Sequence, residues 1–168
     1  MKTFLILIAT CFIGATSPSN EIANEELQNC DSELTVEKNR TFKSADKDGV
    51  SFSLNLQNKS SKVQTYVISA KNISESCANN KNYADPNVQL EPYIVLPYNK
   101  APNNTDDSSA EIEIQPGQSI DFHVKIKVPN NTPVYRWGCI EVEASSTDCS
   151  SRTPKAILSV YIPNPSEG

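Results

Sequence analysis

The stretch Ile120-Asp121-Phe122-His123-Val124-Lys125-Ile126-Lys127-Val128 alternates apolar and polar side chains without interruption. Because successive side chains of a strand point to opposite faces of a sheet, this period of two predicts a strand with one buried and one solvated face. A shorter alternating run, Ala110 to Ile114, and a turn at Pro116-Gly117 precede it. This part of the chain therefore predicts an antiparallel, all-β fold.

Similar runs of alternating or β-branched residues recur along the chain, whereas clean helical periodicity does not extend over a dozen residues anywhere after the N-terminal segment. The further predicted strands are Leu34 with Val36, continuing towards Phe42, then Val50 to Leu56, Val63 to Ala70, Val88 to Leu96, Val134 to Ala144 and Ala156 to Ile162. Pro92 confines the strand around it to a sheet edge or a break, because proline lacks the N–H that a central strand donates. Seven or eight strands at this spacing predict a β-sandwich with Greek-key connections, and a closed barrel is the alternative.

The N-terminus has the pattern of a secretory signal peptide. Lys2 is followed by an almost unbroken apolar run from Phe4 to Ile13 and then by the small residues Gly14-Ala15, after which we expect cleavage. The sequence predicts a signal peptide over 1–15, a flexible leader over 16–31, one β-sandwich over 32–163 and a disordered tail over 164–168. No later segment is apolar enough to span a bilayer. We expect a protein that is secreted, periplasmic or at the cell surface.

The charge of the chain argues against two classes of partner. The net charge is −5 at neutral pH, and loss of Lys2 with the signal peptide makes it −6 (−5 − 1). Nucleic acids and anionic membranes attract clustered Lys and Arg, so neither is an expected partner.

Four of the five cysteines lie beyond the predicted signal peptide: Cys30, Cys77, Cys139 and Cys149. An even number of cysteines in a secreted chain predicts two disulfides. The spacings do not include Cys-x-x-Cys, and His123 is the only histidine, so we expect no metal site.

The sequence does not indicate catalysis or a cofactor. His123 lies between Asp121 and Lys125 on the polar face of its strand and is expected to be a solvated surface residue. The acidic pairs Glu111/Glu113 and Glu141/Glu143 alternate outward along their strands, which is typical of a solvated face. A Gly-x-Ser-x-Gly motif is absent from the sequence. We therefore predict a protein that is not an enzyme.

Four aromatic residues form the candidate binding surface. Tyr135 and Trp137 share the face opposite the apolar residues of their predicted strand, and on a solvated face they suit sugar stacking or a protein hot spot. The alternative is core packing after a bulge that resets the alternation near Gly138. Tyr93 and Tyr98 flank a proline-containing edge and are expected to join such a surface.

The chain from Val50 to Ile162 resembles the immunoglobulin-like domains of bacterial secreted and cell-surface proteins. The resemblance is carried by the Pro-Gly turn in Ile114–Ser119, the alternating strand that ends in Pro129, and the following Gly138-Cys139-Ile140-Glu141-Val142. The segment Leu54–Ser60 is similar to a strand of such domains that ends in Asn and a polar turn.

The resemblance implies an immunoglobulin-like sandwich in an adhesive or structural accessory role. Such a module would bind a cell-surface or cell-wall glycan or a protein partner, without catalysis. The alternative is a secreted inhibitor or effector that blocks a target protein with its long loops, residues 71–87 and 97–109.

The strand layout of these domains also bears on disulfide pairing. In that layout Cys149 lies in the last loop, at the end where the first strand begins after Cys30, and Cys77 can fold back towards Cys139. The resemblance therefore implies the pairs Cys30–Cys149 and Cys77–Cys139, and a local Cys139–Cys149 bridge is the alternative.

Asn-x-Ser/Thr sequons occur at Asn39, Asn58, Asn72, Asn103 and Asn130, all at predicted turns or strand ends. In a eukaryotic secretory pathway they would predict N-glycosylation. The bacterial resemblance favours chance occurrence in a chain rich in Asn and Ser.

Overall fold

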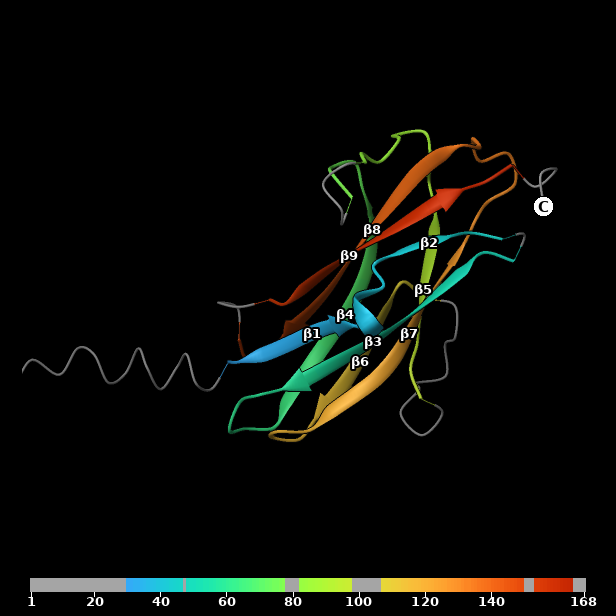
Figure 1. Cartoon of the computed structure of the whole chain (residues 1–168). Coiled ribbons are helices and arrows are strands. Elements are labelled where there is room, and N and C mark those ends of the chain that lie inside the picture. Colours follow the sequence, from blue (N-terminus) through green and yellow to red (C-terminus); the bar gives the residue numbers. More distant parts are fainter. Residues whose placement is uncertain (1–29, 47, 78–81, 98–106, 150–152, 165–168) are drawn as a thin grey trace, which may run out of the picture.

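Two packed β-sheets make up the protein in the computed structural model, which describes residues 30–46, 48–77, 82–97, 107–149 and 153–164 (Figure 1). The four-stranded sheet has the order β1 (Ser32–Val36), β3 (Val50–Asn58), β7 (Ser119–Lys127) and β5 (Glu91–Val95). The five-stranded sheet has the order β2 (Phe42–Ser44), β9 (Lys155–Ile162), β8 (Arg136–Ser146), β4 (Gln64–Ile73) and β6 (Ser109–Ile114). The fold is the predicted immunoglobulin-like sandwich, with nine strands in the described residues rather than seven or eight.

The core lies between the sheets and follows from the alternation. On β7, Phe122, Val124 and Ile126 are at most 1% exposed, while the residues between them face solvent. Full burial of each such side chain contributes roughly 1.5–3 kcal/mol, so the central strands supply most of the driving force for folding. The other central strands contribute Phe52, Leu54, Leu56, Tyr66, Ile68, Ile140, Val142, Leu158 and Val160.

The first strand ends at Val36 and does not continue towards Phe42, which corrects the sequence prediction. A short 3-10 turn, η1 (Glu37–Asn39), follows, in which Lys38 and Asn39 both have a left-handed φ of 53°. This turn carries the chain from the edge of one sheet to the edge of the other, where β2 pairs in parallel with β9. The alternation could not indicate the crossing, because two left-handed residues without glycine leave little signal in a sequence.

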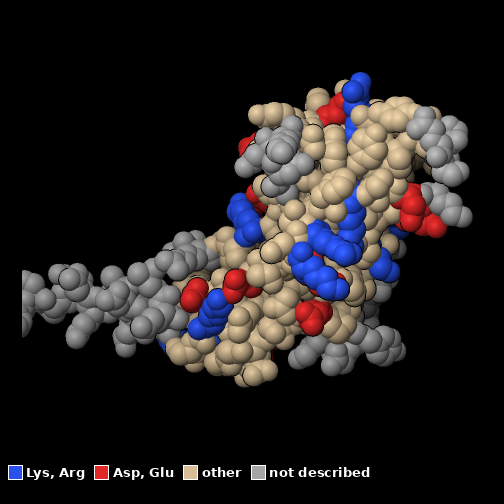
Figure 2. Space-filling model, viewed as in Figure 1, with Lys and Arg blue, Asp and Glu red and all other residues tan. Residues whose placement is uncertain are grey.

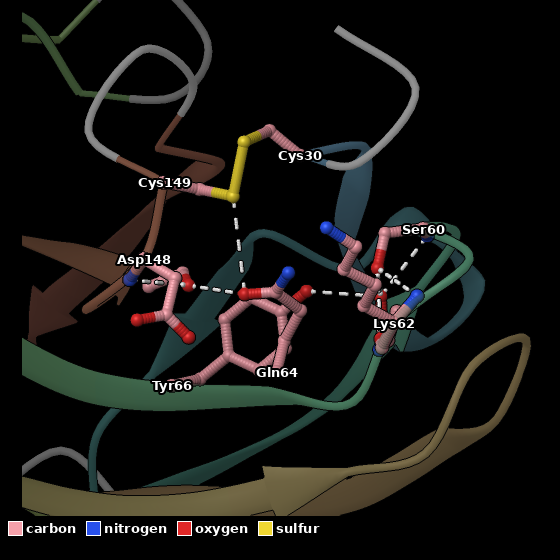
Figure 3. Close-up of a disulfide and its surroundings, with 9 residues drawn as sticks. Cys30, Ser60, Lys62, Gln64, Tyr66, Asp148 and Cys149 are labelled. Atoms are coloured by element: carbon pink, nitrogen blue, oxygen red, sulfur yellow. Dashed lines mark hydrogen bonds between the residues drawn. A yellow bond between two sulfur atoms is a disulfide. The ribbon is translucent and has the colours of Figure 1, made fainter. Parts of the chain in front are cut away.

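The two disulfides are Cys30–Cys149 and Cys77–Cys139, with Cα–Cα distances of 5.4 and 5.5 Å. These are the two pairs that the resemblance to immunoglobulin-like domains implied. Cys30–Cys149 joins the chain before β1 to the turn after β8, where the Gln64 Oε1 atom lies 3.8 Å from the Cys149 Sγ atom (Figure 3). Cys77–Cys139 joins the segment after β4 to the outer face of β8.

A buried amide closes the end of the sandwich at the β3–β4 turn. Asn58 is 0% exposed, and its Nδ2 atom donates to the carbonyl oxygens of Lys62 at 2.8 Å and Ile114 at 2.9 Å. Its Oδ1 atom accepts from the Ser60 N–H at 3.0 Å, the Ser60 hydroxyl at 2.7 Å and the Tyr66 hydroxyl at 3.4 Å. One side chain therefore joins the turn after β3, the start of β4 and the end of β6.

β5 lies at the edge of the four-stranded sheet, as Pro92 predicted. The predicted signal peptide, most of the predicted leader, the tail from residue 165, Tyr98 and Asn103 lie outside the described residues. Within the described ranges, no helix has the length and hydrophobicity needed to cross a bilayer.

Candidate binding surface

Three aromatic side chains meet on the outer face of the five-stranded sheet, one from each of β2, β8 and β9. We call Phe42, Trp137 and Tyr161 the aromatic cluster. Trp137 and Tyr161 are paired across β8 and β9, and their ring centroids lie 5.2 Å apart. Phe42 reaches the same face from β2, with its ring centroid 4.9 Å from that of Trp137. Both distances are typical of favourable aromatic pairs.

The cluster is held in place from beneath and remains partly open to solvent. Phe42 is 50% exposed, and Trp137 and Tyr161 are half-buried. Trp137 also packs against a small apolar group built around the Cys77–Cys139 disulfide, to which Ile73, Ala84 and Ile157 belong. Aromatic side chains fixed in this way lose little conformational entropy when a ligand covers them.

Trp137 lies on the outer face, where the alternation argument placed it. The register between β8 and β9 is continuous from Arg136 to Glu143, so the paired residues contain no bulge. Gly138 faces the interior, where an added Cβ atom would lie 2.5 Å from the Leu90 Cδ1 atom. The small residue therefore allows the segment before β5 to pack beneath the start of β8.

Tyr135 does not share the face of Trp137, because it precedes β8 and the period of two does not reach it. Its φ of 57° is left-handed, and its N–H donates to the Ile162 carbonyl oxygen at 2.7 Å. Its hydroxyl accepts a hydrogen bond from the Asn164 Nδ2 atom at 3.1 Å. Tyr135 is thus bound to the end of β9 and is separate from the aromatic cluster.

Tyr93 lies on the opposite side of the sandwich from Trp137. It pairs with Lys125 on the outer face of the four-stranded sheet, and the Lys127 Nζ atom lies 4.9 Å from the centroid of its ring. The structure therefore does not bring Tyr93 and Trp137 together, and Tyr98 lies outside the described residues.

The sequence prediction missed two members of the aromatic cluster. Tyr161 was within reach, because it lies between the apolar residues Val160 and Ile162 in a predicted strand, and alternation places it on the opposite face from them. The place of Phe42 in the cluster was not predictable, because it depends on the crossing of the chain between the two sheets at η1.

Paired charges occupy the same face beyond the cluster. Lys71 on β4 lies 3.0 Å from Glu141 on β8, and Lys155 on β9 lies 3.3 Å from Glu141 and 3.0 Å from Glu143. The hydrogen bond from Lys71 is the main reason that the pKa of Glu141 is lowered, and the bond to Glu143 is the main reason that the pKa of Lys155 is raised. In Figure 2, basic and acidic side chains are interspersed over the visible face of the molecule.

We expect Glu141→Gln to lower the free energy of unfolding near neutral pH by less than about 1 kcal/mol. Because the native pKa of Glu141 lies below its unfolded value, ionised Glu141 favours the native state, and this contribution is lost as the pH falls through the native pKa. Urea unfolding from neutral pH down to acid measures it. The difference from the parent protein should shrink in acid, and Glu111→Gln on β6 is the matched control. A difference that grows as the pH falls would contradict this account.

No family model matches this chain, and no curated protein matches it in sequence. Solved structures are similar in fold at low identity. They include a FixG-related protein from Vibrio parahaemolyticus, 10% identical with a TM-score of 0.46 over 80% of this chain and 96% of that chain. The CooA pilin subunit from enterotoxigenic Escherichia coli is 8% identical, with a TM-score of 0.46 over 79% of this chain and 97% of that chain.

A family 123 glycoside hydrolase from Clostridium perfringens is 10% identical, with a TM-score of 0.48 over 80% of this chain. This chain spans only 27% of that enzyme. At these identities the likeness concerns the fold and says nothing about ligands.

Proposed function

We propose that this protein is a noncatalytic module that binds a partner protein through the aromatic cluster, in an adhesive or structural accessory role outside the cytosol. The observation that carries the proposal is the cluster itself: Trp137 fixed between Phe42, Tyr161 and a disulfide, yet open to solvent. Trp and Tyr dominate protein hot spots, and such hot spots are apolar centres within a polar rim. The paired charges beyond the cluster supply that rim.

The tilt of the rings favours a protein over a glycan as the ligand. The planes of Phe42 and Trp137 are inclined by 43°, and those of Trp137 and Tyr161 by 50°. A chain of sugar rings stacks on aromatic faces that lie in a common plane, whereas side chains of a protein can fill the spaces between inclined rings. A cell-surface glycan is the competing ligand, and the experiment below includes it.

Two disulfides support a location outside the cytosol. Cytosolic thiols are kept reduced, whereas secreted and periplasmic proteins retain disulfides. Cys30–Cys149 and Cys77–Cys139 fit that setting, as does the predicted signal peptide.

The surroundings of His123 support a noncatalytic role. Its Nδ1 atom lies 3.2 Å from the Ser53 Oγ atom, a pair that the sequence did not indicate because 70 residues separate the two. The pair belongs to a polar ladder on an open sheet face, next to the hydrogen bond from Asn55 to Asp121. Hydrolysis at serine also needs a site that excludes water and donors that stabilise an oxyanion. A cross-strand surface contact is the simpler account of this pair.

The inhibitor alternative has less support. Residues 71–73 belong to β4, and the described part of the segment that follows is fastened to β8 by Cys77–Cys139. Most of residues 97–109 lie outside the described ranges.

Phe42→Ala tests the proposal. The mature protein with both disulfides intact is used to capture proteins from the extracellular fraction of its source, in parallel with co-sedimentation on cell-wall and polysaccharide preparations. Because Phe42 is half exposed, the substitution should leave folding intact while it weakens protein capture at least about tenfold. Tyr93→Ala, on the other sheet, is the matched control and should bind like the parent.

Two outcomes would contradict the proposal. Equal capture by Phe42→Ala and the parent would exclude the aromatic cluster as the binding surface. Saturable binding to a polysaccharide that Phe42→Ala abolishes would identify a glycan as the ligand.

A further inference from the structure

A cavity of about 300 Å³ lies at the end of the sandwich, where β9 ends and where the β7–β8 connection passes the turn after β2. Its apolar wall includes Val128, Pro129, Val134 and Pro163, and Asp46 is the one ionisable group among the described residues that line it. The cavity adjoins the aromatic cluster along the chain, since Tyr161 precedes Ile162 in its wall. Its size is at the lower end of the range for ligand pockets.

The turn that carries Asp46 is held rigidly. The Asp46 Oδ1 atom accepts the N–H of Asp48 at 2.8 Å, and the backbones of Asp46 and Gly49 exchange two hydrogen bonds of 3.1 Å. Gly49 has a φ of 95°, and a Cβ atom there would lie 2.1 Å from the Ile126 carbonyl oxygen, so only glycine fits. One carboxylate oxygen of Asp46 is therefore held within this turn, beside the cavity.

The opposite wall is also preformed. The Thr132 hydroxyl donates to the Pro129 carbonyl oxygen at 2.7 Å, which closes the β7–β8 connection on itself. The left-handed backbones of Asn131 and Tyr135, and the bond from the Tyr135 N–H to Ile162, hold this connection against β9. Left-handed residues other than glycine persist only where their surroundings enforce them, and they are frequent at ligand sites.

The charges of the described residues around the cavity favour a cation. A shallow depression shares Val128 and Pro129 with it and adds Asp48, Glu91 and Lys127. The described residues that line the two hollows therefore include three acidic groups and one basic group. An aliphatic wall with a fixed carboxylate complements a ligand that has an apolar stem and a positive head. The lining residues that the structure describes include no aromatic ring on which a neutral sugar would stack.

We propose that this cavity receives an arginine or lysine side chain of the partner polypeptide. The identity of the occupant as part of a protein rests on the proposed function, whereas the recognition of a basic side chain rests on the cavity alone. The aliphatic part of the side chain packs against Val128, Val134 and Pro163, and the cationic group pairs with the carboxylate of Asp46.

The experiment is an NMR titration of the ¹⁵N-labelled mature protein with N-acetyl-L-arginine amide. N-acetyl-L-citrulline amide, which has nearly the same shape without the charge, is the matched ligand. Arginine amide should shift the backbone amide signals of the described, non-proline residues within 45–49 and 128–134, and the citrulline compound should bind about tenfold more weakly. Asp46→Asn should cause a similar loss for arginine amide, while its amide oxygen still accepts the Asp48 N–H. Asp121→Asn, on the outer face of the four-stranded sheet, should bind like the parent.

Equal binding of the arginine and citrulline compounds, or no change in these signals with arginine amide, would overturn the proposal. So would binding of N-acetylglucosamine to the cavity of the parent and Asp46→Asn alike in place of arginine amide. The titration needs no partner, so it can fail while Phe42→Ala still reduces capture, or succeed when Phe42→Ala has no effect. The two proposals are therefore tested separately.

Discussion

Asn58→Ala is expected to lower the free energy of unfolding by about 3–5 kcal/mol. The substitution removes both donors to the carbonyl oxygens of Lys62 and Ile114 and the acceptor for Ser60 and Tyr66. Because Asn58 is fully buried, water cannot replace these partners without opening the end of the sandwich. Equilibrium unfolding in urea, followed by tryptophan fluorescence and circular dichroism, measures the loss.

Asn55→Ala is the matched control on the same strand. Asn55 lies on the outer face of β3 and donates to the Asp121 Oδ1 atom at 2.8 Å, where water can replace it. We expect a loss of less than about 1 kcal/mol there. Similar losses for the two variants would show that the buried network contributes little.

Removal of the Cys30–Cys149 disulfide by serine substitution at both positions is expected to lower the free energy of unfolding by about 4–5 kcal/mol. The bridge closes a loop with a sequence separation of 119 residues, and in the chain-entropy account long loops restrict the unfolded state most. Thermal and urea unfolding of the oxidised parent and the double variant measure the loss. A change below about 1 kcal/mol would show that the entropic account fails for this protein.

Serine substitution at both Cys77 and Cys139 tests whether this disulfide contributes to binding as well as to stability. Its loop is shorter, with a separation of 62 residues, but the bridge also supports Trp137. At a temperature where both double variants are folded, loss of Cys77–Cys139 should weaken Phe42-dependent capture, and loss of Cys30–Cys149 should not.

The strands were predictable from the sequence because a buried face imposes alternation directly on neighbouring residues. Residues 120–126 show this most clearly: each apolar position is buried or half-buried, and each polar position faces solvent. Pro92 placed β5 at an edge for an equally local reason, the missing N–H.

Features that depend on a left-handed residue or on contacts between distant strands were not predictable. Lys38 and Asn39 turn the chain between sheets and so place Phe42 beside Trp137. The left-handed backbone of Tyr135 places its side chain away from the sheet face that carries Trp137. Asn58 is the last of the alternate residues of β3 that point into the core. Its polar side chain nevertheless suggested that it belongs to a turn.

The burial of Asn58 also bears on N-glycosylation at this position. Asn58-Lys59-Ser60 is a sequon, and an N-linked sugar would be attached to the same Nδ2 atom that donates to two carbonyl oxygens inside the fold. Asn72 opens a second sequon, and its amide is bound to both the N–H and the carbonyl oxygen of Leu90. Oligosaccharide transfer at Asn58 is incompatible with the closed sandwich, so a cell that glycosylates nascent chains would divert this one from its native state.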